Sequence, residues 1–151
     1  MNILDNSIRN IEILLVEDNP ADARLIVEVF DGFTIKKHLT IANDGEEAMD
    51  YLNKKGKYKD RNCPSIIILD LNLPKKDGRE ILKEIKQHEN LKSIPVVILT
   101  TSSDENDVKN SYSNYASAYL TKPANFDEFV GLINSFEDFW FKWVTLPQCV
   151  D

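Results

Sequence analysis

The stretch Ile66-Ile67-Ile68-Leu69-Asp70 contains four consecutive aliphatic residues followed by one carboxylate. A continuous aliphatic run of this length predicts a strand that is buried on both faces, as in parallel sheets covered by helices. Leu71–Pro74 and a turn at Asp77-Gly78 follow. Because ligands of open parallel sheets bind beyond the carboxyl ends of the strands, Asp70 is predicted to lie where the chemistry of such a protein takes place.

Short aliphatic runs alternate with segments of helical periodicity on both sides of this strand. This alternation predicts an α/β fold with a parallel sheet of five strands, flanked by helices. The second strand alternates in polarity and is therefore expected at an edge of the sheet. The predicted strands are 11–16, 35–42, 65–70, 95–100 and 118–120, and the predicted helices are 20–30, 44–52, 78–88, 104–115 and a last helix that starts near 125.

The composition indicates one globular domain in 151 residues, with 42% hydrophobic and 28% charged residues. A net charge of -7 argues against nucleic acid as a partner, because phosphate binding requires a basic surface. The basic loop Lys54–Arg61 is interpreted as solvated surface, and a role in recognition is left open. The sequence shows neither the pattern of a signal peptide nor an apolar stretch long enough to span a membrane. We therefore expect a cytoplasmic location and no association with membranes. Cys63 and Cys149 are predicted to be free thiols.

Polar residues follow several of the predicted strands. Glu17-Asp18 come after the first strand, Asp70 ends the third, Thr100 ends the fourth and Lys122 follows the fifth. Because these strand ends meet at one edge of a parallel sheet, three carboxylates are expected to lie close together and to repel one another unless a cation binds between them. Oxygen ligands favour Mg²⁺ or Mn²⁺, and such an ion would support phosphoryl transfer to a carboxylate.

In their order and spacing these motifs resemble the receiver domains of two-component response regulators, which a partner histidine kinase phosphorylates on aspartate. The matching motifs are Val16–Asn19, Leu69–Pro74 with Gly78, Thr100 and Tyr119–Pro123. The resemblance covers residues 11–138, after a lead of residues 1–10 and before an extension over 139–151. It implies a doubly wound, flavodoxin-like sheet with the strand order 2-1-3-4-5.

The resemblance also implies roles for individual residues around a metal ion. Asp70 would be the phosphoacceptor and a metal ligand. Asp18 would bind the metal directly, Glu17 would bind it through water, and Asn72 would contribute its backbone carbonyl. Mg²⁺ or Mn²⁺ would be the only cofactor.

Four further positions match the phosphoryl contacts and the switch of this family. Thr100 and Lys122 would contact the phosphoryl group. Tyr119 occupies the position of the rotating aromatic switch and would act together with Thr100. The Lys122-Pro123 bond resembles a cis peptide of the family, which proline makes accessible.

The last helix carries more aromatic residues than the sheet requires. At about 100° per residue, Trp140 and Trp143 continue an apolar stripe, Phe139 lies at its edge, and Phe141 lies on the opposite side. The segment resembles the ending of stand-alone receivers that are paired with bacterial phytochromes, in which the final helix helps to form a dimer. We therefore predict a homodimer surface that includes Phe139, Trp140, Phe141 and Trp143.

The favoured function is a phosphorylation-operated switch with a sensor histidine kinase as its partner, and not an enzyme that acts on an external substrate. One alternative is a phosphohydrolase of the haloacid dehalogenase type, which also uses a strand-end aspartate. That family has a second aspartate two residues later, where this chain has Asn72. Another alternative is a pseudo-receiver scaffold that is never phosphorylated.

Overall fold

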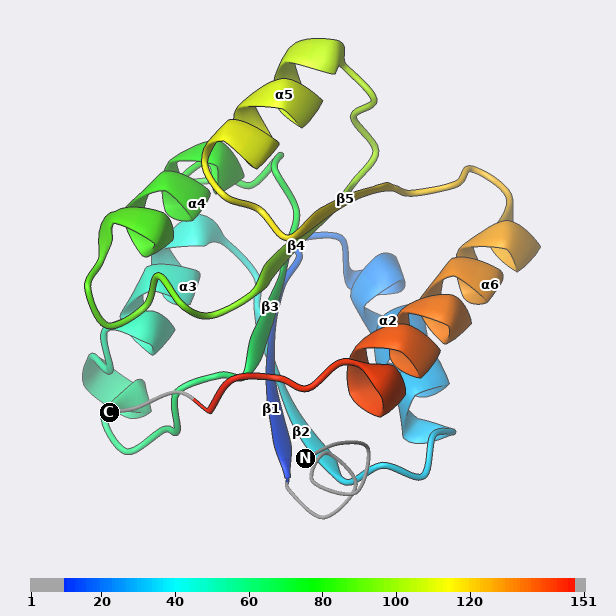
Figure 1. Ribbon diagram of the computed structural model, residues 1–151, viewed down its shortest axis with the longest axis horizontal. Coiled ribbons are helices and arrows are strands. Elements are labelled where there is room, and N and C mark those ends of the chain that lie inside the picture. The colour runs from blue at the N-terminus through cyan, green and yellow to red at the C-terminus, as the bar shows by residue number, and fades with distance from the viewer. Residues whose placement is uncertain (1–9, 149–151) are drawn as a thin grey trace.

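Five parallel strands form one sheet at the centre of the molecule (Figure 1). In the computed structural model, which describes residues 10–148, the order along the sheet is β2-β1-β3-β4-β5 and every neighbouring pair is parallel. The predicted strand order is therefore confirmed, with β2 at an edge. The strands are β1 (Ile11–Val16), β2 (Lys37–Ala42), β3 (Ile66–Leu69), β4 (Val96–Thr100) and β5 (Ala118–Thr121).

Helices cover both faces of the sheet, as a doubly wound fold requires. One layer holds α2 (Pro20–Asp31) and α6 (Phe126–Glu137), and the other holds α3 (Gly45–Leu52), α4 (Gly78–Gln87) and α5 (Glu105–Ser113) (Figure 1). A 3₁₀ turn, η1 (Gly56–Tyr58), lies within the basic loop. Between residues 10 and 148, none of the helices has the length and apolar character that a membrane span needs.

An asparagine or aspartate side chain caps the N-terminus of each of these five α-helices by accepting a backbone N–H of the first turn. Both residue types are among the strongest N-caps because their side-chain oxygen satisfies a donor that has no partner within the helix. Each cap lies in the loop that follows a strand. The helices therefore begin beside the carboxyl edge of the sheet. The caps are Asn19, Asp44, Asp77, Asp104 and Asn125.

Alternate residues of the central strands pack into the two helical layers. In β1, Val16 lies in the apolar cluster that includes α3 and α4, and Leu15 lies in the cluster that includes α2 and α6. All four residues of β3 are buried, because this strand is covered on both sides. The uninterrupted aliphatic run of the sequence is thus explained by a central position in the sheet.

The end of the last helix differs from the prediction. The predicted stripe assumed an α-helix throughout, but the chain forms a π-helix, η2 (Asp138–Trp143), in which the N–H of Val144 donates to the carbonyl of Phe139 over 2.9 Å. Because the hydrogen bonds of a π-helix join residues five apart, its turn is wider than that of an α-helix. The aromatic residues of this turn consequently point in other directions than a wheel of 100° per residue predicts.

Phe141 shows the effect of this wider turn most clearly. It is fully buried, and its ring packs edge-on against Phe30 and Phe136 with centroid distances of 5.2 and 5.7 Å. The prediction that Phe141 lies on an exposed dimer surface is therefore wrong. Phe139 and Trp143 are 55% and 60% exposed.

The apolar core continues beyond residue 138, which is the predicted end of the receiver domain. Leu146 is buried in the same cluster as the residues of α2 and α6, and Trp140 packs against that cluster. The segment that follows α6 is thus part of the packed domain up to Leu146. The predicted lead over residues 1–10 lies outside the described part of the chain except for its last residue.

Two smaller predictions are wrong. The Lys122-Pro123 bond is trans, and no cis peptide bond occurs in the described part of the chain. Cys63 is part of a disulfide bond and is not a free thiol. Separation along the sequence is a poor guide to which cysteines meet in space. The prediction for Cys149 falls outside the described residues.

Glu137, the last residue of α6, is only 1% exposed, and neither of its carboxylate oxygens has a hydrogen-bond partner among the described residues. Burial raises the pKa of Glu137 to about 7, although the charge of Lys37 opposes this shift. The ordinary value of 4.5 applies in the unfolded chain. The folded state therefore favours the protonated carboxyl, and the free energy of unfolding should decrease as the pH rises from 4.5 through 7.

We expect Glu137→Gln to increase the free energy of unfolding by about 1–3 kcal/mol at about pH 8, because the amide carries no charge into the apolar surroundings. At about pH 5 the difference from the wild type should nearly vanish, because the carboxyl is then protonated in the folded state. Urea denaturation at both pH values measures this. Glu28→Gln, on the exposed face of α2, is the control. A stabilisation that is equal at both pH values would contradict the prediction.

Candidate functional site

Carboxylates from two strand ends meet at the carboxyl edge of the sheet. Glu17 and Asp18 follow β1 and Asp70 follows β3, and these strands are neighbours in the sheet, with Val16 beside Leu69. One carboxylate oxygen of each acidic residue lies within 4.8 Å of the other two. Glu17 and Asp70 are buried, whereas Asp18 is exposed. The fold thus brings together the three predicted metal-ligating side chains.

Lys122, which follows β5, places a positive charge among these carboxylates. Its Nζ lies 2.6 Å from Glu17 Oε1, 3.1 Å from Asp70 Oδ2 and 3.0 Å from Asp22 Oδ2. Burial acts against the charged lysine, but the hydrogen bond and charge of Glu17, aided by Asp22 and Asp70, raise the pKa of Lys122 above its ordinary value. Burial raises the pKa of Glu17 to about 6, and its hydrogen bond with Lys122 limits this rise. Because its pKa is raised, Lys122 is charged at neutral pH.

Backbone groups hold the second oxygen of each buried carboxylate. Glu17 Oε2 accepts a hydrogen bond from the N–H of Asn19 over 3.0 Å, and Asp70 Oδ1 accepts one from the N–H of Asn72 over 3.1 Å. The N–H of Asp70 itself donates to the carbonyl of Val16 in the neighbouring strand. Each carboxylate is thus fixed on one side by the backbone and directed on the other side toward Lys122.

Thr100, at the end of β4, is fully buried beside this group. Its carbonyl accepts a hydrogen bond from the N–H of Lys122 over 2.7 Å, so the ends of β4 and β5 are joined. Its Oγ1 lies 3.5 Å from the N–H of Ser102. Thr100 and Lys122 therefore belong to the same edge of the sheet as the carboxylates, as predicted from their positions after the strands.

Gly78 lies against the loop that carries Asp70. Its N–H donates to the carbonyl of Leu71 over 2.9 Å, and a Cβ at this position would overlap the backbone oxygen of Asp70. Only glycine allows α4 to begin this close to the loop. The glycine of the sequence motif is thus explained by steric exclusion.

Sequence reasoning missed Asp22, which provides the third carboxylate partner of Lys122. It lies four residues after Asp18, in the first turn of α2, and this spacing next to an acidic pair is a signal that could have identified it. Sequence reasoning also missed the pair of Arg79 and Asp107, whose atoms form two hydrogen bonds of 2.7 and 2.8 Å. Residues this far apart in the chain leave no local pattern.

The Arg79–Asp107 pair connects the loop after Asp70 with Tyr119. Arg79 Nη2 lies 3.5 Å from the side-chain oxygen of Asn72, and Asp107 accepts a hydrogen bond of 2.6 Å from the hydroxyl of Ser102. The hydroxyl of Tyr119 donates to the carbonyl of Ser102 over 2.8 Å. The hydrogen bond from Arg79 holds the pKa of Asp107 down at about 2. Tyr119 is therefore linked to the site through a continuous set of polar contacts.

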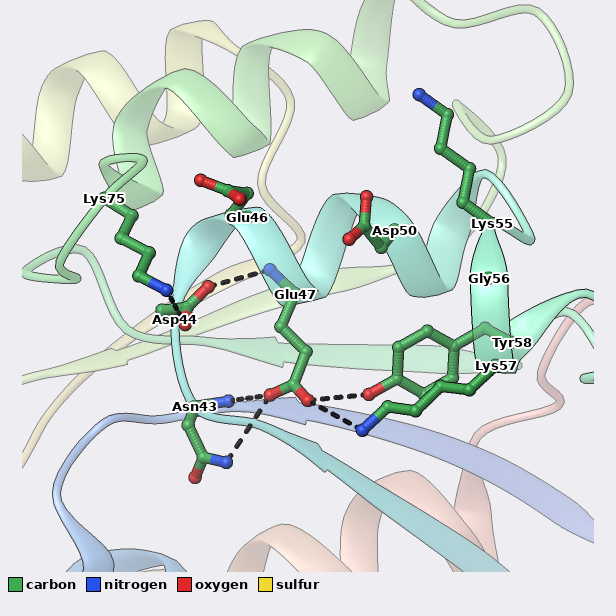
Figure 2. A pocket seen from close by; sticks show the side chains of 10 residues that line it. All are labelled: Asn43, Asp44, Glu46, Glu47, Asp50, Lys55, Gly56, Lys57, Tyr58 and Lys75. Carbon is green, nitrogen blue, oxygen red and sulfur yellow. Dashed lines mark hydrogen bonds and ion pairs between the residues drawn. The ribbon is translucent and has the colours of Figure 1, made fainter.

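A second concavity, of about 400 Å³, lies over α3 and the basic loop (Figure 2). Tyr58, in η1, donates its hydroxyl to Glu47 over 2.7 Å, and Lys57 Nζ lies 3.5 Å from the same carboxylate. Burial and the hydrogen bond to Glu47 raise the pKa of Tyr58 to about 12. The basic loop is thus anchored to α3 rather than freely solvated. None of the residues that contact Lys122 lines this concavity.

The donor set at the sheet edge fits a divalent metal ion. All three side chains offer carboxylate oxygens, the hard ligands that such ions prefer. Lys122 supplies only one positive charge for Glu17, Asp70 and Asp22, and Asp18 has no partner among the residues that the structure describes. The cluster therefore has an excess of negative charge that a cation would reduce.

The sequence profile of the response regulator receiver domain matches residues 13–134. The chain belongs to this family, a family of signalling proteins. It is 51% identical over 135 residues to the response regulator Rcp1 of Synechocystis sp., a match that covers 89% of this chain and 92% of that protein. It is also 40% identical over 135 residues to a probable methanogenesis regulatory protein, FilR2, of Methanothrix harundinacea, covering 89% of this chain and 86% of that protein.

Solved structures of relatives agree with the fold. The Mn²⁺-bound form of Rcp1 matches with a TM-score of 0.89 at 51% identity, over 90% of this chain and 98% of that one. The phosphorylated cyanobacterial phytochrome response regulator RcpA matches with a TM-score of 0.90 at 46% identity, over 93% of this chain and all (100%) of that one. The chain is thus a CheY-like receiver that is homologous to phytochrome response regulators, and an aspartate phosphoacceptor is expected for its family.

We expect Lys122→Ala to lower the free energy of unfolding by about 3–5 kcal/mol in the absence of divalent cations, because buried Glu17 and Asp70 lose their counter-charge. Addition of MgCl₂ or MnCl₂ should restore much of this loss and should stabilise the variant more than the wild type. Thermal unfolding with and without the salt measures both effects. Lys83→Ala, at an exposed position of α4, is the control. Equal stabilisation of variant and wild type by the cation would contradict the prediction.

Proposed function

We propose that Asp70 accepts a phosphoryl group from a phosphohistidine of a sensor histidine kinase, with Mg²⁺ or Mn²⁺ bound beside it. The observation that carries this proposal is the position of the Asp70 carboxylate at the edge of the sheet. This carboxylate belongs to the acidic cluster and also contacts Lys122. The crystal structure of the related response regulator RcpA in its phosphorylated form supports it. This exchange is proposed to take place in the cytoplasm.

In the transfer, an oxygen of Asp70 forms a bond to phosphorus, the bond between phosphorus and the histidine nitrogen breaks, and the imidazole keeps the electron pair. We assign Asp18 and Asp70 as direct metal ligands, Glu17 as a ligand through water, and Asn72 as a ligand through its backbone carbonyl. The ion would neutralise charge on the phosphoryl oxygens. Lys122 and Thr100 bind the remaining oxygens as charge develops.

The charge of the phosphoryl group must then alter a surface that partners bind. We propose that Thr100 moves toward the group and that Tyr119 responds through the loop between β4 and α5. The contact of Tyr119 with the carbonyl of Ser102 supports this, because a shift of the loop displaces its acceptor. The surface made by α5, β5 and α6 would change as a result.

The kinase is proposed to dock beside α2 and the start of α6. A concavity of about 320 Å³ opens there, lined by Leu25, Phe126 and Lys122 among other residues. Phe126 is 65% exposed, which gives a partner an apolar anchor close to the site. The similarity to phytochrome response regulators favours a phytochrome-type sensor kinase.

A homodimer is proposed to form through the end of α6 and the π-helix that follows it. Phe139 and Trp143 are exposed and lie within five residues of each other, and the ring of Trp140 packs against Phe139 at a centroid distance of 5.6 Å. Exposed aromatic residues gathered in this way are typical of contact surfaces. Phe141 has no part in this surface because it is buried.

We expect wild-type protein incubated with acetyl phosphate and MgCl₂ to gain the mass of one phosphoryl group, and Asp70→Asn to gain none, because its amide is not a nucleophile for phosphorus. Intact-mass spectrometry measures both. Asp77→Asn, which removes a carboxylate from the same loop, is the control. An unmodified wild-type protein would favour a pseudo-receiver scaffold. Steady phosphate release from small phosphomonoesters that requires Asp70 would favour a phosphohydrolase.

We expect Trp143→Ser to weaken dimerisation about tenfold or more, because the loss of a central aromatic residue commonly costs 2 kcal/mol or more at an interface. Light scattering over a range of concentrations measures the molar mass, with and without beryllofluoride. Phe126→Ser, at a similarly exposed aromatic position at the start of α6, should leave the dimer unchanged. A wild-type protein that is monomeric under both conditions would contradict the proposed dimer.

A further inference from the structure

Lys122 has three carboxylate partners, and Asp22 differs from the other two in its position. Glu17 and Asp70 follow strands, are buried and belong to the group that could hold a metal ion. Asp22 lies on α2, its side chain is 25% exposed, and it is not a member of that group. Its Oδ2 nevertheless lies 3.0 Å from Lys122 Nζ, as close as the oxygen of Asp70.

The start of α2 holds Asp22 firmly in this position. The side-chain oxygen of Asn19 accepts the N–H groups of both Ala21 and Asp22, over 2.9 and 3.1 Å. Pro20 at the first helical position fixes the backbone further. Asn19 also donates its own N–H to Glu17. Asp22 therefore presents its carboxylate to Lys122 from a rigid helical turn that is connected to the acidic cluster.

Metal binding would change the surroundings of Lys122 in a way that leaves Asp22 as its partner. An ion ligated by Asp70 and, through water, by Glu17 would compete with Lys122 for these two carboxylates. Asp22 is not a proposed ligand, so its oxygen stays available to the ammonium group. A lysine that lost all its carboxylate partners on metal binding would be a buried charge without compensation, which is costly.

We propose that Asp22 is a positioning residue that holds Lys122 when the metal is bound, and that it releases Lys122 when a phosphoryl group arrives at Asp70. The inference rests on the proposed function and extends it to a residue outside the predicted site. Asp22 thereby stabilises the metal-bound, unphosphorylated state, in which Lys122 needs a partner. In the phosphorylated state Lys122 pairs with a phosphoryl oxygen, and the carboxylate of Asp22 competes with that pair.

This competition predicts effects of opposite sign on two ligands. Without the carboxylate of Asp22, Lys122 loses its remaining partner on metal binding, so Mg²⁺ should bind about threefold to tenfold more weakly. At saturating Mg²⁺, the phosphoryl analogue beryllofluoride no longer has to draw Lys122 away from Asp22. Beryllofluoride should therefore bind about threefold to tenfold more tightly. A general distortion of the site would weaken both ligands.

The test measures the affinity for MgCl₂ alone, and then for beryllofluoride at a Mg²⁺ concentration that saturates each variant, by isothermal titration calorimetry on the full chain. The variants are Asp22→Asn, which keeps the shape of the side chain, and Asp22→Glu, which keeps the charge and should restore wild-type behaviour. Glu28→Gln removes a carboxylate from the exposed face of the same helix and is the control. Circular dichroism at the titration temperature confirms that each variant is folded.

Weaker Mg²⁺ binding together with tighter beryllofluoride binding in Asp22→Asn, with neither change in Glu28→Gln, supports the inference. If the affinities of Asp22→Asn are unchanged, or if it loses affinity for both ligands, the inference is overturned. The proposed function is unaffected by that result as long as the wild-type protein binds beryllofluoride. A wild-type protein that binds Mg²⁺ but no beryllofluoride contradicts the proposed function and the inference together.

Discussion

The ammonium group of Lys122 among buried carboxylates is the interaction on which the site depends. Glu17 and Asp70 follow neighbouring strands, and both carboxylates are buried. Their negative charges would therefore repel each other with little screening by water. Lys122 offsets that repulsion and pairs with both residues and with Asp22. A buried pair of this kind adds little net stability, but loss of one partner is costly. The cluster is thus held in a state that an incoming cation or phosphoryl group can rearrange.

Two structural features bring these charges together. Parallel pairing aligns the carboxyl ends of β1, β3, β4 and β5, so that residues far apart in the chain share one edge. Side-chain caps then begin each helix in the loop that follows a strand. Gly78 lets the start of α4 approach the backbone of Asp70. The backbone around the site is held by hydrogen bonds that the N–H groups of Asn19, Asn72 and Gly78 donate. Rigid placement of this kind is what positional and electrostatic catalysis of phosphoryl transfer requires.

The contacts outside the carboxylate cluster provide a physical route from the site to the surface. Arg79 joins the loop after Asp70 to Asp107 on α5, and Ser102 joins Asp107 to Tyr119. These are direct polar contacts, so a displaced loop must break or move at least one of them. Chains of direct polar contacts of this kind can carry energetic coupling between two sites. In the proposed switch, a change of charge at the sheet edge would reach the face formed by α5 and β5 through these contacts.

The sequence by itself determined the fold class and the positions of Glu17, Asp70, Thr100 and Lys122, because strand periodicity and the residue after each strand are local properties of the chain. The strand order followed from the resemblance of the motifs to a known family. Only the tertiary structure decided that Asp22 joins Lys122 and that Arg79 meets Asp107, since contacts between elements leave no local pattern. The burial of Phe141 was likewise decided by packing: a π-helix departs from the period on which a helical wheel relies, and the ring fills the core beside Phe30.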